Sequence, residues 1–392
     1  YTVIDEWNKS PDNRQTFRAL GSFYGQFDFG KIWAPLEGLS YKISFGPDFR
    51  HYRQGIFISK DSAVKMGSKN YAKYATDRYL SWTLDNQINY NKTFGKHNLG
   101  VTLLQSASKY NKESGSESAN AIPNENFEWY NMGSVDITDA ATYGAGMSTG
   151  MSENQLASYM ARVNYAYNDR YLLTVSGRYD GSSKFPKESR YGFFPSVSAG
   201  WNIAQEKFME STQNWLGSLK LRASYGMIGN QNVPAYSFIP TMAVNNKYNG
   251  WISNGNYVTA ITSIPSLVSR NFTWEKVGTL DIGIDFSMFS NRFTGTFDWY
   301  QRNTNGMLAP GVQLPAVVGA DAPYQNTADM RTRGWELSFN WRDQIGKVSY
   351  RVGFNLSDSK SKIVKYDSNS SYILSSQKTN ALTGGTYTFW EF

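Results

Sequence analysis

Residues 158–179 decide the fold, and they read SYMARVNYAYNDRYLLTVSGRY. Apolar and polar side chains alternate on both sides of a three-residue turn, Asn168-Asp169-Arg170. One face carries Tyr159, Ala161, Val163, Tyr165 and Tyr167 before the turn and Tyr171, Leu173, Val175, Gly177 and Tyr179 after it. A period of two is the period of a β-strand, so the pattern predicts a hairpin with one apolar and one hydrophilic face. Residues 193–203 and 219–225 repeat it.

Aromatic residues bracket the apolar face of these strands. Three pairs stand eight residues apart on that face: Tyr159 and Tyr167, Tyr171 and Tyr179, and Phe193 and Trp201. Eight residues cover roughly 26 Å along a strand and about 20 Å across a bilayer at a tilt near 40°. Rings at both ends suit a lipid-facing strand, because they tolerate the wet interface. A soluble β-sandwich also alternates, but its strands seldom run ten or more residues between aromatics.

The composition agrees with a membrane β-barrel. The chain has 392 residues, 16% aromatic, and no apolar run near the ~18 residues that a membrane helix needs. Cysteine is absent, which excludes disulfides, thiol nucleophiles and thiolate metal sites. The formal charge of +7 is spread along the chain, so we interpret it as solvated loops and lumen rather than nucleic-acid binding. The alternative use of this charge is attraction of anionic outer-leaflet lipid, which includes lipopolysaccharide, or of substrate.

The rest of the chain repeats the same unit. We expect one long strand from Phe17 to Phe29 and a polar stretch at 60–78. Turns are expected at 35–38, 91–96, 290–292 and 343–346, and long loops at 108–154 and 301–333. Short and long connections alternate, which is typical of an outer-membrane barrel with its short turns in the periplasm. The pattern predicts about twelve strands, with a thirteenth possible at 387–392.

Residues 1–392 are expected to be part of one larger barrel. Open sheet edges in a membrane leave backbone groups unpaired, and the chain starts and stops in mid-pattern without a signal peptide. The hydrophilic faces carry charged residues, namely Arg162, Arg178, Asp180, Arg222, Asp281, Asp285, Asp298, Glu336 and Arg342. We interpret these as lumen or plug-contact residues. Asp281 and Asp285 share one face of one strand, but charged lumens make such pairs common, so no catalytic residue is predicted.

Other chemistry is scarce. His51 and His97 lie in different hairpins, so neither a metal site nor a triad is expected, and no cofactor is predicted. A ligand signal comes only from aromatic residues in loops rich in Asn, Ser and Gly, which can stack on sugar rings or peptide side chains: Trp129, Tyr130, Tyr248, Trp251 and Tyr257. The alternative is that these rings pack the loops together or contact a partner lipoprotein.

Several segments look like one known family. They are residues 178–185 (RYDGSSKF), 191–201 (YGFFPSVSAGW), 219–226 (LKLRASYG) with 229–231 (GNQ), 273–276 (TWEK), 281–286 (DIGIDF) and 331–336 (RTRGWE). In this order they resemble the barrel of the SusC/RagA family of TonB-linked outer-membrane transporters, from about Tyr159 to Leu356.

The resemblance implies more than the spacing does. It implies a transmembrane antiparallel up-and-down barrel of about 22 strands in the outer membrane of a Gram-negative bacterium. It also implies an N-terminal plug and a TonB-contacting segment, neither of which is visible in residues 1–392. The implied function is import of oligosaccharides or peptides, driven through the TonB-ExbB-ExbD complex, with a SusD-like lipoprotein as partner. A passive porin or a soluble β-rich glycan-binding module remain as alternatives.

Overall fold

The computed structural model describes residues 2–136, 146–241, 251–253, 256–258, 266–269, 272–310, 315–318, 323–366, 374–379 and 386–391. Almost all regular structure in this part of the chain is β-strand. The strands are β1 (Asp12–Leu20), β2 (Phe23–Asp28), β3 (Leu39–Ile58), β4 (Tyr71–Phe94), β5 (His97–Asn120), β6 (Gly146–Tyr167), β7 (Tyr171–Ser182), β8 (Tyr191–Asn202), β9 (Leu216–Asn230), β10 (Trp251–Ser253), β11 (Asn256–Val258), β12 (Glu275–Met288), β13 (Phe293–Pro310), β14 (Tyr324–Ile345), β15 (Val348–Tyr366), β16 (Leu374–Thr379) and β17 (Thr386–Glu391). The prediction of an all-β chain is confirmed.

Helical turns occupy the start of the chain and the connections. The α-helix is α1 (Val3–Lys9), and the short 3-10 turns are η1 (Phe29–Lys31), η2 (Ala34–Leu36), η3 (Glu125–Phe127), η4 (Met132–Ser134), η5 (Lys187–Ser189), η6 (Ile203–Gln205), η7 (Lys207–Thr212) and η8 (Ala316–Val318). Among the described residues, no helix is both long and apolar enough to cross a membrane.

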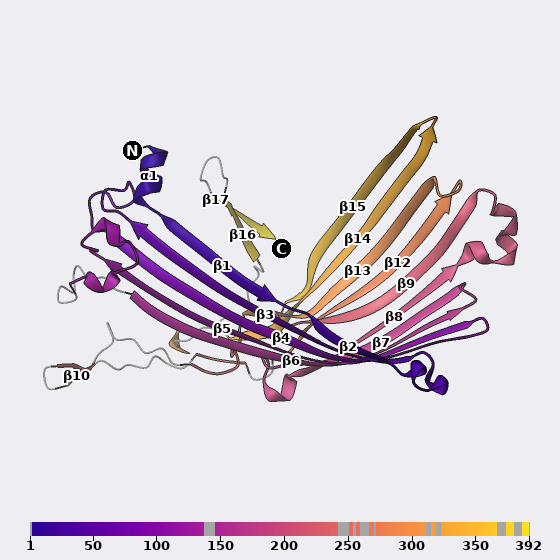
Figure 1. Ribbon diagram of the computed structural model, residues 1–392, viewed down its shortest axis with the longest axis horizontal. Helices are drawn as coiled ribbons and strands as arrows, with labels where there is room; N and C mark the ends of the chain where they lie inside the picture. The colour runs from indigo at the N-terminus through magenta and orange to yellow at the C-terminus, as the bar shows by residue number, and fades with distance from the viewer. Residues whose placement is uncertain are drawn as a thin grey trace. The chain divides into compact units, whose positions relative to one another are not determined.

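Strand pairing follows sequence order. Thirteen of the described strands form one sheet in the order β1-β3-β4-β5-β6-β7-β8-β9-β12-β13-β14-β15, with β2 also paired to β3 (Figure 1). The pairs with a described register are antiparallel, as an up-and-down sheet requires. The strand expected at 387–392 forms as β17, but it pairs with β16 in a separate two-stranded sheet. A strand is therefore present at this position, and its partner is the preceding strand of a local hairpin.

The chain divides into two compact units. Unit 1 comprises residues 1–27, 41–87 and 105–157, and unit 2 comprises residues 28–40, 88–104 and 158–392. The core of unit 1 is a small apolar cluster of Phe57, Ala72, Ala119, Ile122, Trp129 and Val135. In unit 2, the corresponding buried group consists of the aromatic residues Phe185, Phe194, Phe272 and Trp274.

Two predicted turns have the backbone that a tight hairpin needs. Asn168 and Asp169 have φ of 53° and 56°, and the Arg170 amide donates to the Tyr167 carbonyl at 3.0 Å. Two successive positive φ angles define the type I′ turn, whose twist matches that of the flanking strands. Ser290 and Asn291 also have positive φ, of 56° and 65°, but here the left-handed run begins one residue earlier, at Phe289 with φ of 53°. Both turns were predicted from the sequence and are confirmed.

Several strands are longer than predicted. The turn expected at 91–96 shrinks to residues 95–96 and the turn at 343–346 to 346–347, while β4 begins within the polar stretch 60–78. Within the loop expected at 108–154, β5 runs on to Asn120 and β6 begins at Gly146, and within the loop expected at 301–333, β13 runs on to Pro310 and β14 begins at Tyr324. The residues added to these strands are polar. Outside the apolar band, strands pair through backbone hydrogen bonds and do not need apolar side chains. Polar pairs hold β5 to β6 there: Lys109 Nζ lies 2.9 Å from a Glu153 carboxylate oxygen.

The strand expected from Phe17 to Phe29 is broken. It forms as β1 and β2, separated at residues 21–22, and Phe29 begins a 3-10 turn instead. The Gly21 amide donates to the Pro47 carbonyl at 3.0 Å. Pro47 has no amide hydrogen to donate in return, so the ladder cannot continue through this pair.

The two faces of the strands differ as the sequence predicts. Apolar side chains of unit 2 are exposed on one face, with Tyr159 at 53%, Val175 at 47% and Phe193 at 56% exposure. The alternate residues bear the polar network described below. Exposed apolar residues repeated along strand after strand do not suit a soluble sandwich, in which one face of each sheet packs on another.

Candidate functional site

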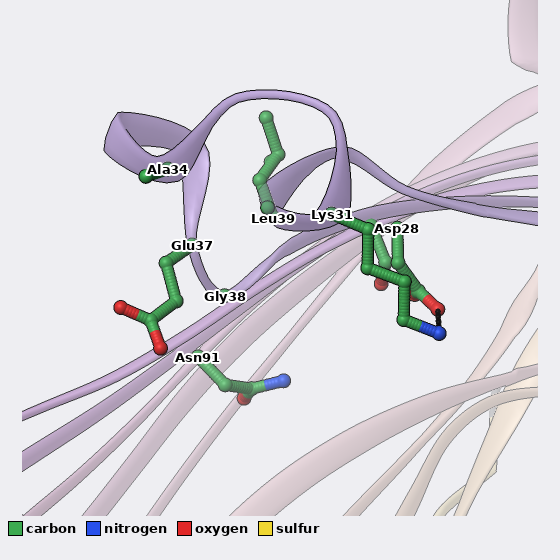
Figure 2. Close-up of a pocket in the computed structure, with 9 residues that line it drawn as sticks. Asp28, Lys31, Ala34, Glu37, Gly38, Leu39 and Asn91 are labelled. Atoms are coloured by element: carbon green, nitrogen blue, oxygen red, sulfur yellow. Dashed lines mark ion pairs between the residues drawn. The ribbon is translucent and has the colours of Figure 1, made fainter.

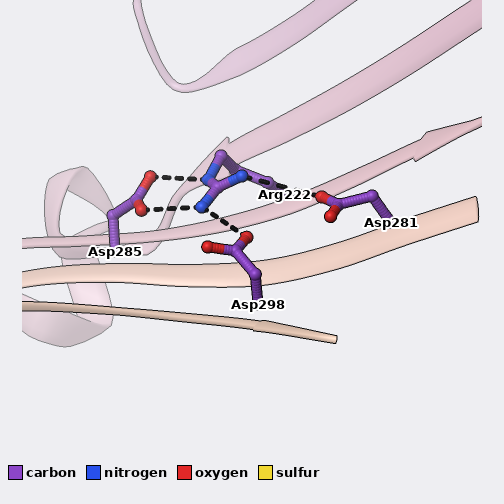
Figure 3. Close-up of polar contacts among 4 residues, drawn as sticks. All are labelled: Arg222, Asp281, Asp285 and Asp298. Atoms are coloured by element: carbon purple, nitrogen blue, oxygen red, sulfur yellow. Dashed lines mark hydrogen bonds and ion pairs between the residues drawn. The ribbon is translucent and has the colours of Figure 1, made fainter. Parts of the chain in front are cut away.

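A charged network lies on the polar face of β9, β12 and β13. The Arg222 guanidinium donates to both oxygens of Asp285, at 2.7 and 2.9 Å, and to Asp298 Oδ1 at 2.8 Å. Asp281 completes the group, with its Oδ1 3.8 Å from Arg222 Nη1 (Figure 3). One cation therefore joins three carboxylates across three strands, and the bidentate pair with Asp285 fixes the plane of the guanidinium.

A glycine makes room for this network. Gly283 lies directly opposite Arg222 on β9 and Asp298 on β13, between Asp281 and Asp285 on its own strand. A Cβ at position 283 would come within 2.2 Å of Asp298 Oδ1 and 2.8 Å of Arg222 Nη2. The guanidinium and the carboxylate thus meet directly above the glycine backbone. Any larger residue would separate them.

The other predicted charged residues lie on β6, β7 and β14. Arg178 donates to Asp180 at 2.8 Å and to the buried Ser158 hydroxyl at 2.8 Å. Glu336 stands opposite Asp298 in the register of β13 and β14. Arg162 and Arg342 take no part in the Arg222 network. Asp281 and Asp285 share one face, as predicted. Their arginine partner lies 63 residues before Asp285, and no local pattern in the sequence indicates it.

Metal chemistry has no support in the described part of the chain. There, no group of three or more His, Asp or Glu side chains is placed to hold a metal ion. Each carboxylate oxygen that faces Arg222 is already held by a guanidinium nitrogen.

Four aromatic side chains, Phe185, Phe194, Phe272 and Trp274, form what we call the aromatic anchor. All four are buried, and Phe185 is completely so. The Phe185 ring lies 5.0 Å from the Trp274 ring and 5.7 Å from the Phe272 ring, centroid to centroid. Phe194 reaches the other side of Trp274 at 5.4 Å. The anchor joins the β7–β8 loop to β8 and to the segment that precedes β12.

Hydrogen bonds lock the loops around the anchor. Trp274 Nε1 donates to the Arg190 carbonyl at 2.9 Å, and the Thr273 hydroxyl donates to the Ser189 carbonyl at 3.0 Å. Asn326 donates to the carbonyls of Thr273 and Gly306, at 3.0 and 2.6 Å. The connection after β7 and the segment before β12 are therefore tied to each other, and Asn326 ties that segment to β13 and β14.

The predicted loop aromatics have different surroundings. Trp129 is 6% exposed and packs in the unit 1 core, over Gly55, where a Cβ would fall 2.2 Å from the indole. Tyr130 follows it and is 70% exposed, with its ring 5.3 Å from that of Trp129. Trp251 and Tyr257 lie on the paired strands β10 and β11. Tyr248 lies outside the described residues.

A shallow cavity of about 600 Å³ lies in the β2–β3 connection (Figure 2). Its lining includes Lys31, Glu37 and Asn91, and Asp28 lies 3.6 Å from Lys31 Nζ. Gly38 has a φ of +88°, and a Cβ there would overlap the Asn91 carbonyl. The predicted turn at 35–38 is confirmed and is fixed by this contact.

Comparison with known proteins identifies the family of the chain. Residues 3–392 match the family described as TonB dependent receptor-like, beta-barrel. The chain belongs to this family. TonB-dependent receptors are outer-membrane transporters rather than enzymes, so the predicted barrel, its location and the prediction that the chain is not an enzyme are confirmed.

Individual proteins that are similar in sequence to this chain are also TonB-dependent receptors. TonB-dependent receptor P26 of Formosa agariphila is 33% identical over 365 residues, which cover 91% of this chain and 35% of the relative. TonB-dependent receptor SusC of Bacteroides thetaiotaomicron is 35% identical over 217 residues, covering 55% of this chain and 21% of SusC. The chain thus spans about a third or less of these relatives.

A solved structure shares the fold. The RagAB peptide importer in its open-open state superposes with a TM-score of 0.81 at 22% identity, over 99% of this chain and 40% of that chain. The predicted SusC/RagA resemblance is confirmed. The segments that carried it meet in space: 178–185, 191–201, 229–231 and 273–276 all contribute to the aromatic anchor or its bonds, and Lys184 Nζ lies 3.4 Å from the Gln231 carbonyl.

Proposed function

We propose that the full-length protein is an active importer of oligosaccharides or peptides in the outer membrane. One observation carries the proposal: strands that match a TonB-dependent receptor barrel expose an apolar face and place a charged network, centred on Arg222, on the other. An apolar outer wall dissolves in lipid, while a charged inner wall keeps the interior wet and suits hydrogen-bonding cargo. The description of RagAB as a peptide importer supports peptide as one cargo class.

Energy for import comes, in this proposal, from the inner-membrane proton gradient through TonB, ExbB and ExbD. A plug domain and a TonB-contacting segment belong to the same protein outside residues 1–392, whose span is 35% of the length of receptor P26. The plug and the cargo would contact the charged inner face of the barrel.

A SusD-like surface lipoprotein is the proposed partner at the long-loop rim. The aromatic anchor supports this, because it holds the β7–β8 loop and the segment before β12 in one fixed arrangement on which a lid can rest. We propose Tyr130, Tyr248, Trp251 and Tyr257 as residues that contact cargo or lipoprotein. Tyr130 is 70% exposed, and the buried Trp129 beneath it holds it in place.

Uptake by cells that carry the full-length protein tests the proposal. Labelled oligosaccharides and labelled peptides are supplied to cells with intact TonB, to cells that lack TonB, and to cells treated with a proton uncoupler. We expect one cargo class to enter only with TonB and a proton gradient. Uptake that persists without either would instead identify a passive channel. A protein recovered in the soluble fraction would overturn the membrane assignment.

The loop residues need a separate measurement. In the full-length protein, Tyr130→Ala removes an exposed ring, while Tyr130→Phe keeps the ring and removes only the hydroxyl. We expect Tyr130→Ala to weaken cargo or lipoprotein binding and Tyr130→Phe to bind nearly as the parent protein does, because stacking needs only the ring. Equal binding by all three proteins would remove Tyr130 from the site.

A further inference from the structure

The tip of the β4–β5 hairpin is basic and aromatic. β4 ends at Phe94, Gly95 turns the chain with a φ of +58°, and β5 begins at His97. Phe94 is 48% exposed, and Lys92 Nζ lies 5.5 Å from the centroid of its ring. Lys96 and His97 are exposed as well. A short turn needs only Gly and small polar residues, so this composition requires a separate explanation.

Neighbouring strands continue the same surface. His97 Nδ1 lies 2.7 Å from the Tyr165 hydroxyl, and the imidazole centroid lies 4.9 Å from that of Tyr167. The Tyr167 ring is stacked on Tyr171, 6.4 Å away. The Asn168 amide donates to the Lys96 carbonyl at 2.7 Å, which fixes the two hairpin tips side by side within unit 2. Tyr167 and Tyr171 belong to the exposed apolar face, so this surface is continuous with the lipid-facing wall.

Neither lysine of this surface is neutralised by an ion pair. Lys92 and Lys96 form no ion pair with any residue that the structure describes. The nearby Glu206 is engaged, since it pairs with Arg170 at 3.3 Å and accepts hydrogen bonds from Tyr171 and Trp201. The adjoining turns contribute two exposed carboxylates, Asp169 and Glu37, and the Gly38 carbonyl beside Glu37 accepts a hydrogen bond from the Asn91 amide at 2.9 Å. The two ammonium groups are therefore available to an anion beside the aromatic rings.

We propose that Lys92, Lys96 and His97 bind the phosphate of a phospholipid headgroup in the inner leaflet of the outer membrane. The two ammonium groups offer charge-assisted hydrogen bonds to phosphate oxygens. When His97 Nδ1 accepts the Tyr165 hydroxyl hydrogen, Nε2 carries the ring proton and donates it to the phosphate. Phe94, Tyr167 and Tyr171 pack against the glycerol and the first methylenes of the acyl chains, as interfacial aromatic residues do.

Lipid binding at this tip would anchor the barrel in the membrane and is independent of the cargo. It requires the short-turn rim to meet the inner leaflet, as the alternation of short and long connections indicates. A lysine near an anionic surface strengthens binding by roughly fivefold, so loss of both should weaken it about 25-fold.

The test uses the full-length protein in nanodiscs of phosphatidylcholine that contain increasing fractions of phosphatidylglycerol. Bound phosphatidylglycerol is counted by native mass spectrometry after release from the disc. We expect Lys92→Gln/Lys96→Gln to lower the affinity about 25-fold and Lys92→Arg/Lys96→Arg to restore it. His97→Gln should lower it severalfold. The matched control, Lys207→Gln/Lys347→Gln, removes the same charge from exposed lysines in other short turns and should leave retention unchanged.

Three results would overturn the proposal. Unchanged retention by Lys92→Gln/Lys96→Gln would show that these lysines do not hold lipid. An equal loss in the control variant would show that only the total charge of the rim matters. Displacement of the lipid by an equal concentration of inorganic phosphate would make the site a free-anion site rather than a headgroup site.

Discussion

Replacement of Gly283 by alanine tests the geometry of the charged network. In an open strand, Gly→Ala stabilises a protein by about 0.5–1 kcal/mol, because alanine loses less conformational entropy on folding. At position 283 the added Cβ would lie 2.2 Å from Asp298 Oδ1. The carboxylate must move away, and its 2.8 Å hydrogen bond from Arg222 is lost. The structure therefore predicts the opposite sign.

The size of the effect follows from the exposure of the two partners. A hydrogen bond to a charged group contributes roughly 1.5–3 kcal/mol. The Arg222 and Asp298 side chains are 31% and 22% exposed, so water replaces part of the loss. We expect Gly283→Ala to destabilise the barrel by about 1–2 kcal/mol. If the network is absent from the unfolding transition state, the unfolding rate rises about 5- to 30-fold.

Unfolding of the full-length protein in detergent, followed by tryptophan fluorescence at a fixed temperature, measures this rate. Gly115→Ala in β5 is the matched control, because the nearest atom to its Cβ is 3.8 Å away, an ordinary contact. Asp298→Ala removes the carboxylate that the added methyl group would strike, so the double variant should cost less than the sum of the two single variants. Strictly additive effects, or a Gly283→Ala protein as stable as Gly115→Ala, would refute the reasoning.

Three further predictions concern other parts of the chain. Hydrogen bonds from Tyr171 and Trp201 hold the pKa of Glu206 below its usual value. The stability that this adds is therefore complete above the ordinary pKa of a glutamate and is lost as the pH falls through the lowered pKa. Stability curves of the parent protein and Glu206→Gln should differ at neutral pH and converge in acid. Phe185→Ala removes a completely buried ring from the aromatic anchor and should destabilise it by about 3–5 kcal/mol; hydrogen exchange across residues 181–190 should rise, whereas the exposed Lys187→Ala should leave it unchanged. Asp169→Gly relieves a φ of 56° and should stabilise the hairpin by about 0.5–1 kcal/mol, which thermal unfolding would detect.

Local patterns predicted the hairpins and their faces because alternation and turn chemistry act over a few residues. The turn at Asn168-Asp169 and the exposure of Val175 needed no knowledge of distant segments. Strand ends were harder to predict. Beyond the apolar band, residues such as Ser114 and Gly150 pair through hydrogen bonds alone and have the composition of a loop.

Partners across the sheet could not be predicted in the same way. Arg222 meets Asp285 only because the register of β9 and β12 brings them together, and nothing near either residue encodes that register. The aromatic anchor has the same origin. Phe185 and Trp274 were visible as parts of familiar motifs, but their contact at 5.0 Å depends on how two loops fold back. Gly283 carried a signal, since a glycine between two aspartates on one strand suggests a close approach.

The aromatic anchor has a consequence for how such receptors diversify. A substitution in either tied segment changes the packing that the other needs, so these loop bases are constrained to evolve together. Insertions in stretches beyond the anchor, such as 232–241, leave the ring contacts intact. Selection can then vary the outer stretches while the segments that support them stay constant.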